Sequence, residues 1–184
     1  GGNTKVCGQL FAYANGDKDA AKSYYTALAG GRDIEPEIID AISEGVANMA
    51  DILADEFGFN KDEYMDWTGV NVGGTNMGAM SPEYPEMPGH EKMALWTTHA
   101  GASDGYLYQG LKQNVTDRVD AIDVWYSSPA KSIIQDPVTK TVVGVTVERD
   151  GKEMNIRALN GVCICTGGFE CNKEMVQHYL NVIN

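Results

Sequence analysis

The sequence predicts an α/β fold with α+β elements, and two stretches carry this prediction. Residues 162–165 form a short apolar run that stops at Thr166-Gly167-Gly168, and Asn172 can then cap a helix. This order is typical of strand, glycine turn and helix. Residues 130–158 hold three strand-like segments separated by turn residues, which predicts a three-stranded antiparallel β-meander. A chain of 184 residues suits one domain, or one domain with an excursion.

The glycine turn after residue 165 allows two interpretations. In open α/β sheets, ligands sit beyond the carboxyl ends of strands, where helix N-termini present unpaired N–H groups. Glycine also suits a tight βα loop that binds nothing. On these residues alone the second interpretation is favoured, because a single Gly-Gly turn is a weak motif.

The expected strands lie in the second half of the chain. Asp150-Gly151 is a strong hairpin signal, and Asp136-Pro137 marks a second hairpin. Two further apolar segments are expected to flank the meander as more buried strands. The five predicted strands are 122–126, 130–135, 141–149, 152–158 and 162–165.

The first half of the chain is expected to be mainly helical. Residues 17–29 read as a short helix, and a long amphipathic helix begins near Ile34 with Pro36 in its first turn. Its apolar face is expected at Ile38, Ile42, Val46 or Met49, Leu53 and Phe57, with Gly58 as the stop. A third helix is expected within 100–115, capped by Ser103 or Asp104, with Leu107, Leu111 and Val115 on one face.

Residues 61–101 are expected to form an irregular loop excursion. They contain five of the eight methionines, together with Trp67, Trp96 and three prolines. A long irregular segment inside a compact domain tends to be functional or mobile. His90 and His99 are candidate polar site groups here, although a lone loop histidine is usually solvated.

The formal net charge of −12 argues against nucleic acid and anionic membrane surfaces as partners, because both are negatively charged and bind clustered lysine and arginine side chains. No apolar run approaches the roughly 20 residues that span a membrane, so no membrane span is expected. No signal peptide is visible, and the chain starts at Gly1 without an initiator methionine. The N-terminus is therefore expected to be missing, which leaves a cytoplasmic and an exported location both open.

The four cysteines do not predict a metal site. Cys163 and Cys165 would share one face of a strand, and Cys171 and His178 follow them. Their spacing matches none of the common zinc patterns. A disulfide framework is also not expected in an acidic domain of this size.

The first residues suggest an anion-binding turn. Backbone N–H groups after Gly1-Gly2 can form a nest, to which Asn3, Thr4 and Lys5 could each add a donor. The alternative is a frayed chain end, which is common at termini.

Five motifs follow one another in the chain: GGNTKV, GGRD, GASDGYLYQGLKQ, DVWYSSPAKSIIQDPVTKTVVGV and VCICTGGFECNKEMV. In this order they resemble a known flavoprotein family, that of soluble fumarate reductases, urocanate reductase and 3-ketosteroid dehydrogenases. The resemblance covers essentially all of residues 1–184. It implies a truncated Rossmann-like FAD-binding domain that lacks the N-terminal GxGxxG βαβ unit and the capping, substrate-binding domain.

The resemblance also implies FAD-contacting residues. Asn3 and Thr4 match the family's GGN[ST] loop, Ala130 matches a backbone contact to adenine, and Thr166-Gly167-Gly168 match the turn beside the phosphates and sugar. Gln9 stands where glycine is commoner, so a clash or a new hydrogen bond is expected there. The implied cofactor-binding residues are Gly2, Asn3, Thr4, Lys5, Gly8, Gln9, Ala130, Thr166, Gly167 and Gly168. No catalytic residue is assigned, because the family's proton donor and substrate clamp lie downstream of this chain.

By the same resemblance, the parent protein would be an FAD-dependent oxidoreductase acting on CH–CH bonds. It would move a hydride between the flavin and an activated C=C bond of a small-molecule substrate, with an electron-donor protein as a candidate partner. This chain alone is expected to be inactive and to bind FAD weakly or not at all, because affinity is pooled from many contacts. The rival hypothesis is a non-enzymatic α+β domain that binds a partner through the Met- and Trp-rich loop 61–101.

Overall fold

A computed structural model describes residues 2–68, 71–72, 75–76, 83–101 and 104–180. The chain divides into two compact units, residues 1–119 and residues 120–184, which are described separately below.

The helices of the first unit follow the sequence signals closely. α2 (Lys18–Leu28) and α3 (Pro36–Asp55) confirm the two predicted helices. The Asp17 side chain accepts a hydrogen bond from Ala20 N at 2.9 Å and so caps α2. Pro36 occupies the first turn of α3, where its missing N–H costs nothing. The unit also contains α1 (Gly2–Val6) and α4 (Tyr106–Thr116).

The buried face of α3 differs from the predicted one in its first half. Ile38 and Ile42 are 50% and 42% exposed. The residues that α3 buries are instead Ser43, Ala47, Ala50 and Leu53. Small side chains allow α2 and α3 to approach closely, which places the buried stripe on the alanines.

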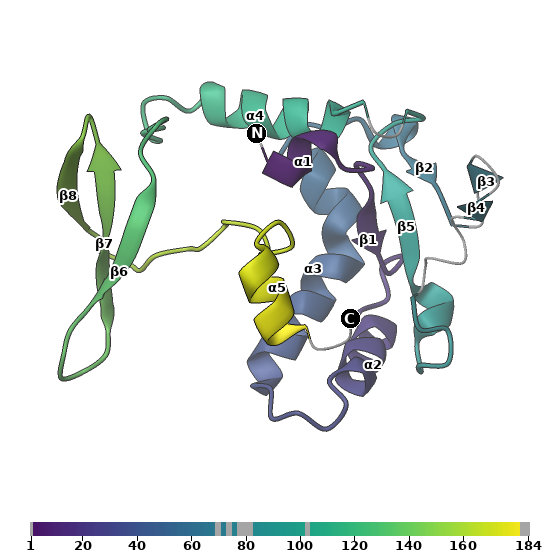
Figure 1. Ribbon diagram of the computed structural model, residues 1–184. Coiled ribbons are helices and arrows are strands. Elements are labelled where there is room, and N and C mark those ends of the chain that lie inside the picture. Colours follow the sequence, from purple (N-terminus) through teal and green to yellow (C-terminus); the bar gives the residue numbers. More distant parts are fainter. Residues whose placement is uncertain (1, 69–70, 73–74, 77–82, 102–103, 181–184) are drawn as a thin grey trace. The chain divides into compact units, whose positions relative to one another are not determined.

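A three-stranded antiparallel sheet lies beside these helices, in the order β1 (Phe11–Tyr13), β5 (Ala94–Thr97), β2 (Met65–Asp66). Phe11 pairs with Trp96, and Met65 pairs with Thr97. Figure 1 shows β1 running along α3, which its contacts confirm. One core cluster joins Phe11, Ala50, Leu53 and Phe59. A second joins Ala14, Ala21, Tyr24 and Met93.

The described part of segment 61–101 contains regular secondary structure. It supplies β2 and the central strand β5, and also η1 (Lys61–Glu63), η3 (His90–Lys92) and the β3 (Asn71–Val72) and β4 (Thr75–Asn76) hairpin. Met77, Met80 and Pro82 lie outside the described residues. The pairing of β5 with both β1 and β2 explains why this distant segment folds against the N-terminal strand.

The second unit contains the predicted meander, with strand order β6 (Ala130–Gln135), β7 (Val142–Arg149), β8 (Lys152–Arg157) (Figure 1). Asp150 and Gly151 both take positive φ, at 52° and 72°, as the predicted tight hairpin requires. At Gly144, a Cβ atom would lie 2.2 Å from the carbonyl oxygen of Ile156, so glycine lets β7 and β8 approach.

The two flanking strands predicted at 122–126 and 162–165 are absent, and those predictions were wrong. Within the described part of the second unit, neither segment pairs with a strand. Ile164 is 61% exposed. An apolar run becomes a strand only when a neighbour takes up its backbone hydrogen bonds. The helix after the glycine turn is confirmed as α5 (Lys173–Tyr179), since Asn172 Oδ1 accepts a bond from Met175 N at 3.1 Å.

Candidate functional site

The residues predicted to form an anion-binding turn are helical. Gly2, Asn3, Thr4 and Lys5 belong to α1, and their side chains are exposed. The turn prediction was wrong, because the carbonyl of Asn3 accepts a helical bond from Cys7 N at 2.8 Å. The backbone amides therefore run along a helix and do not curl around a point, as a nest requires.

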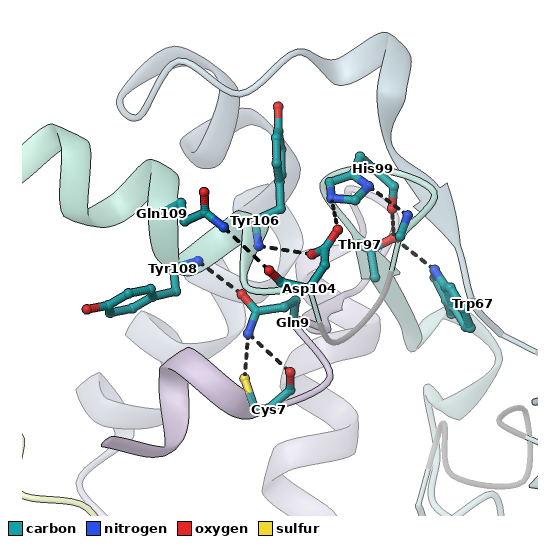
Figure 2. A network of polar contacts seen from close by, with 10 residues as sticks. Cys7, Gln9, Trp67, Thr97, His99, Asp104, Tyr106, Tyr108 and Gln109 are labelled. Carbon is teal, nitrogen blue, oxygen red and sulfur yellow. Dashed lines mark hydrogen bonds and ion pairs between the residues drawn. The ribbon is translucent and has the colours of Figure 1, made fainter. Parts of the chain in front are cut away.

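Gln9 follows this helix and is the centre of a buried polar network (Figure 2). Its side chain is only 2% exposed, and its backbone has φ of 60°. Nε2 donates to the carbonyl oxygens of Thr4 at 2.8 Å and Cys7 at 3.1 Å, and it lies 3.2 Å from Cys7 Sγ. The expected consequence of a glutamine at this position is thus a new set of hydrogen bonds.

The other end of the same amide caps α4. Gln9 Oε1 accepts a hydrogen bond at 3.0 Å from the backbone N–H of Tyr108, and Tyr108 is the third residue of that helix. Asp104 Oδ1 accepts from Tyr106 N at 3.0 Å. The residue at the N-cap is Gly105, with φ of 78°, one position after the predicted Asp104, and the other predicted cap, Ser103, lies outside the described residues. Gly105 has no side chain to offer, and the helix N–H groups are satisfied from its neighbours.

Gly8 is the other predicted site residue in this segment. The space around it does not require a glycine. A Cβ atom there would meet only Leu10, at 3.6 Å, which is ordinary contact. The predicted site residues of the first unit lie in α1 or within three residues of its end. They are Gly2, Asn3, Thr4, Lys5, Gly8 and Gln9.

His99 belongs to a second polar chain in the first unit, which the sequence did not reveal (Figure 2). Trp67 Nε1 donates to Thr97 Oγ1 at 2.8 Å, and that hydroxyl donates to the carbonyl oxygen of His99 at 2.5 Å. Gly101 N donates to His99 Nδ1 at 2.6 Å. His99 Nε2 lies 2.9 Å from Asp104 Oδ2, an ion-pair distance at an angle outside hydrogen-bond geometry.

These contacts join His99 to Gly101, Asp104 and Tyr106, which lie just before α4 or at its start. Both ring nitrogens face a partner, and the ring meets Tyr106 edge to face at 4.1 Å. An open pocket of 510 Å³ lies against Glu63, His99, Ala100, Asp104 and Tyr106. Since Nδ1 already accepts from a backbone N–H, the imidazole is not placed as a general base toward this pocket. The spacing His99, Gly101, Asp104 just before a helix is the signal that could have indicated the arrangement.

In the second unit, the structure brings together two of the predicted cofactor residues. Ala130 and Thr166 line one groove of 220 Å³, whose walls are Lys131, Ser132, Ile133, Val145 and residues 162–165. Lys131 Nζ pairs with Glu148 at 2.8 Å, and this hydrogen bond raises the pKa of the lysine. The ammonium group of Lys131 is therefore paired with the Glu148 carboxylate.

Gly167 and Gly168 follow the groove without lining it. Gly167 has φ of 76° with open space where a Cβ would stand, so glycine is needed there for backbone conformation. At Gly168 a Cβ would lie 2.3 Å from Glu170 Oε2, which is the movable end of a side chain.

The described residues contain no group of three or more His, Cys, Asp or Glu side chains that could hold a metal ion. Among their helices, none combines the length and apolar character needed to cross a membrane.

Comparison with known proteins identifies the family. The family model described as "FAD binding domain" matches residues 1–183. A 3-oxosteroid 1-dehydrogenase of Comamonas testosteroni is 45% identical over 60 residues, which are 33% of this chain and 10% of that protein. The crystal structure of 3-ketosteroid delta1-dehydrogenase from Sterolibacterium denitrificans, in complex with 1,4-androstadiene-3,17-dione, superposes with a TM-score of 0.71.

The structural match covers 97% of this chain and 43% of the Sterolibacterium enzyme at 16% sequence identity, so it bears on the fold alone. The chain thus spans less than half of that solved relative, and its alignment with the Comamonas enzyme is shorter still. The family match nevertheless covers nearly every residue and confirms the predicted resemblance: the chain belongs to the FAD binding domain family.

Proposed function

We propose that this chain is part of a flavin-dependent oxidoreductase that moves a hydride between FAD and an activated carbon–carbon bond. The observation that carries the proposal is the family match over residues 1–183. Both relatives described above are steroid dehydrogenases, and this supports the proposed chemistry. They favour a 3-ketosteroid or a similar apolar ketone over fumarate as the substrate of the whole protein.

The groove of the second unit has a mainly apolar lining. Ile133, Val145 and Ile164 are among its apolar residues, and Thr166 is a polar residue beside them. We propose that Ala130 and Thr166 hold part of FAD here, and that Gly167 leaves the adjoining backbone open to it. In the first unit, the corresponding proposal concerns Gly2, Asn3, Thr4, Lys5 and Gly8, while Gln9, which is 2% exposed, would act by holding this segment in place. When bound, FAD would supply the hydride-transferring group, and these residues bind and orient it.

Weak binding is expected of the chain by itself. The free energy of cofactor binding is what remains when the entropy lost on binding is subtracted from the favourable energy of many contacts. Because the chain covers only 43% of the solved relative, we expect it to make only part of those contacts. A method that reports millimolar binding residue by residue is therefore the right test. We suggest titrating FAD into the ¹⁵N-labelled chain and following backbone amide shifts by NMR.

The expected result is that the amides of Thr166, Gly167 and Gly168 shift, together with Ala130. Gly167→Ala should weaken or abolish these shifts, because alanine disfavours φ of 76°. Gly151→Ala is the matched control: it has φ of 72°, equally open space, and lies at the β7–β8 hairpin away from the groove. Unchanged spectra at millimolar FAD, or equal effects of both variants, would overturn these site assignments.

The partner-binding alternative loses part of its support, although Met65 is 37% exposed and Met77 and Met80 lie outside the described residues. Trp67 is 9% and Met93 7% exposed, and Trp96 packs against Tyr13 with ring centroids 5.1 Å apart. In the described part of 61–101 these large side chains are therefore used inside the first unit. They do not form the exposed patch that a partner would need.

A further inference from the structure

Cys163 and Cys165 form a close pair of thiols. Their sulfur atoms are 3.7 Å apart, and both residues are exposed. The two positions are separated by one residue in a segment that is not part of a sheet. Its backbone is therefore not held by a ladder of hydrogen bonds and can adjust to a change at the side chains.

The geometry points to a redox-active dithiol: we propose that a low-molecular-weight disulfide oxidises Cys163 and Cys165 to an intramolecular disulfide. Residues two apart in extended chain have Cα atoms about 6.6 Å apart, which is within the range that a disulfide bridges. The sulfur atoms need to close only the remaining gap. Exposure gives the oxidant access to both.

The reaction is a double thiol–disulfide exchange. The Cys163 thiolate attacks one sulfur of the added disulfide, forming a mixed disulfide and releasing one thiolate. Cys165 then loses its proton to solvent and attacks Cys163 Sγ, which releases the second thiol. The chain loses two hydrogens and two electrons, and the added disulfide is reduced to two thiols.

The order of attack follows from the contact between the two sulfurs. The pKa of Cys165 is raised, first by the hydrogen bond to Cys163 and then by the negative charge on Cys163. A raised pKa disfavours the thiolate of Cys165, so we assign the first attack to Cys163 and the resolving step to Cys165. Cys7 and Cys171 are also exposed and serve as internal references for simple accessibility.

Both thiols lie on the wall of the groove that Ala130 and Thr166 share. Oxidation therefore changes the shape of that wall whatever occupies the groove. The inference concerns the thiols themselves and stands independently of the proposed flavin chemistry.

The test is to incubate the reduced chain with oxidised glutathione, block remaining thiols with an alkylating agent and map the products by mass spectrometry. The expected product has lost two hydrogens, carries a Cys163–Cys165 crosslink and has alkylated Cys7 and Cys171. Cys165→Ser should stop at the mixed disulfide, with one glutathione on Cys163. Cys163→Ser should react more slowly at Cys165.

Cys171→Ser is the matched control and should leave the crosslink unchanged. Because the substituted side chains are exposed, serine variants should keep the fold, which an amide NMR spectrum can verify. The wild-type spectrum should also show Ala130 and Thr166 shifting on oxidation. A crosslink to Cys171 or Cys7, stable glutathione adducts on wild type, or equal reactivity of all four thiols would overturn the proposal.

Discussion

Gln9 Oε1 accepts a hydrogen bond from Tyr108 N at 3.0 Å, across 99 positions of the sequence. This bond satisfies one of the N–H groups that the first turn of α4 cannot satisfy itself. Nε2 of the same side chain is bonded to Thr4 and Cys7, so one amide joins α1 to the start of α4. A non-glycine residue at φ of 60° costs about 1–2 kcal/mol, and these bonds offset that cost.

Replacing Gln9 by alanine should therefore destabilise the first unit. The variant keeps the unfavourable φ and leaves buried backbone groups unpaired, which together should lower the free energy of unfolding by about 1–3 kcal/mol. Urea unfolding followed by tryptophan fluorescence measures this. Gln113→Ala is the control, since its amide bonds only Asp117 on the exposed side of the same helix. The free energy of unfolding of Gln9→Gly should lie between those of wild type and Gln9→Ala, because glycine relieves the strain at positive φ. Equal stability of wild type and Gln9→Ala would refute the capping role.

Gly89 lies where η3 meets α2, and this contact has no room for a side chain. A Cβ atom at Gly89 would stand 2.1 Å from the carbonyl oxygen of Ala20, and φ there is 84°. Gly89→Ala should lower the free energy of unfolding by about 3 kcal/mol or more, the sum of the φ cost and the overpacking cost. Gly58→Ala, with φ of 77° and open space, should lose only about 1 kcal/mol. Equal losses would show that backbone conformation alone, and not the close contact, requires glycine at 89.

Tyr64 makes the first unit sensitive to alkaline pH. Burial, assisted by the charges of Asp51 and Asp55, raises the pKa of its phenol to about 12. The unfolded chain ionises this group near the ordinary value of 10.0. Between these two values the unfolded state binds fewer protons, so stability falls as the pH rises. In urea unfolding at a series of pH values above 9, Tyr64→Phe should show a shallower fall than wild type. Tyr84→Phe, at a residue that is 42% exposed, is the comparison. Parallel slopes for Tyr64→Phe and wild type would contradict the prediction.

Asp136 makes the β6–β7 turn of the second unit sensitive to acid. Oδ1 accepts bonds from Thr139 N at 2.7 Å, Thr139 Oγ1 at 3.0 Å and Val138 N at 2.9 Å. These bonds, with the Thr139 amide first, hold the pKa of the carboxyl below its ordinary value of 3.8. The stabilisation is complete above that ordinary value and is lost as the pH falls through the lower folded value.

Asp136→Asn keeps an acceptor oxygen but no charge. It should be less stable than wild type at pH 6, and the difference should shrink as the pH is lowered below 3.8. Unfolding of the meander, followed by the NMR signals of β6 and β7 against urea, measures this. Asp123→Asn, an exposed change in the same unit, should leave the profile as it is. A stability difference that is independent of pH would mean that the carboxylate charge does not contribute.

The elements that were predicted correctly are those with local causes. Asp17 before α2, Pro36 in α3 and Asp150-Gly151 in the meander each act on residues within a few positions. Their effect on capping, φ or turn type is nearly independent of the rest of the chain. The family resemblance likewise depended on short motifs in a fixed order.

The features that sequence reasoning missed depend on distant partners. Residues 162–165 have a strand pattern but no strand, since pairing requires a neighbour that the pattern cannot specify. Nothing near Gln9 indicates that its amide caps a helix 99 positions away, and nothing near Trp67 indicates a bond to Thr97. By itself, the sequence determined where the main helices and the meander's tight turn lie, and to which family the chain belongs. Only the tertiary structure decided which polar groups meet and which apolar runs are paired, because those choices depend on contacts between segments far apart in the chain.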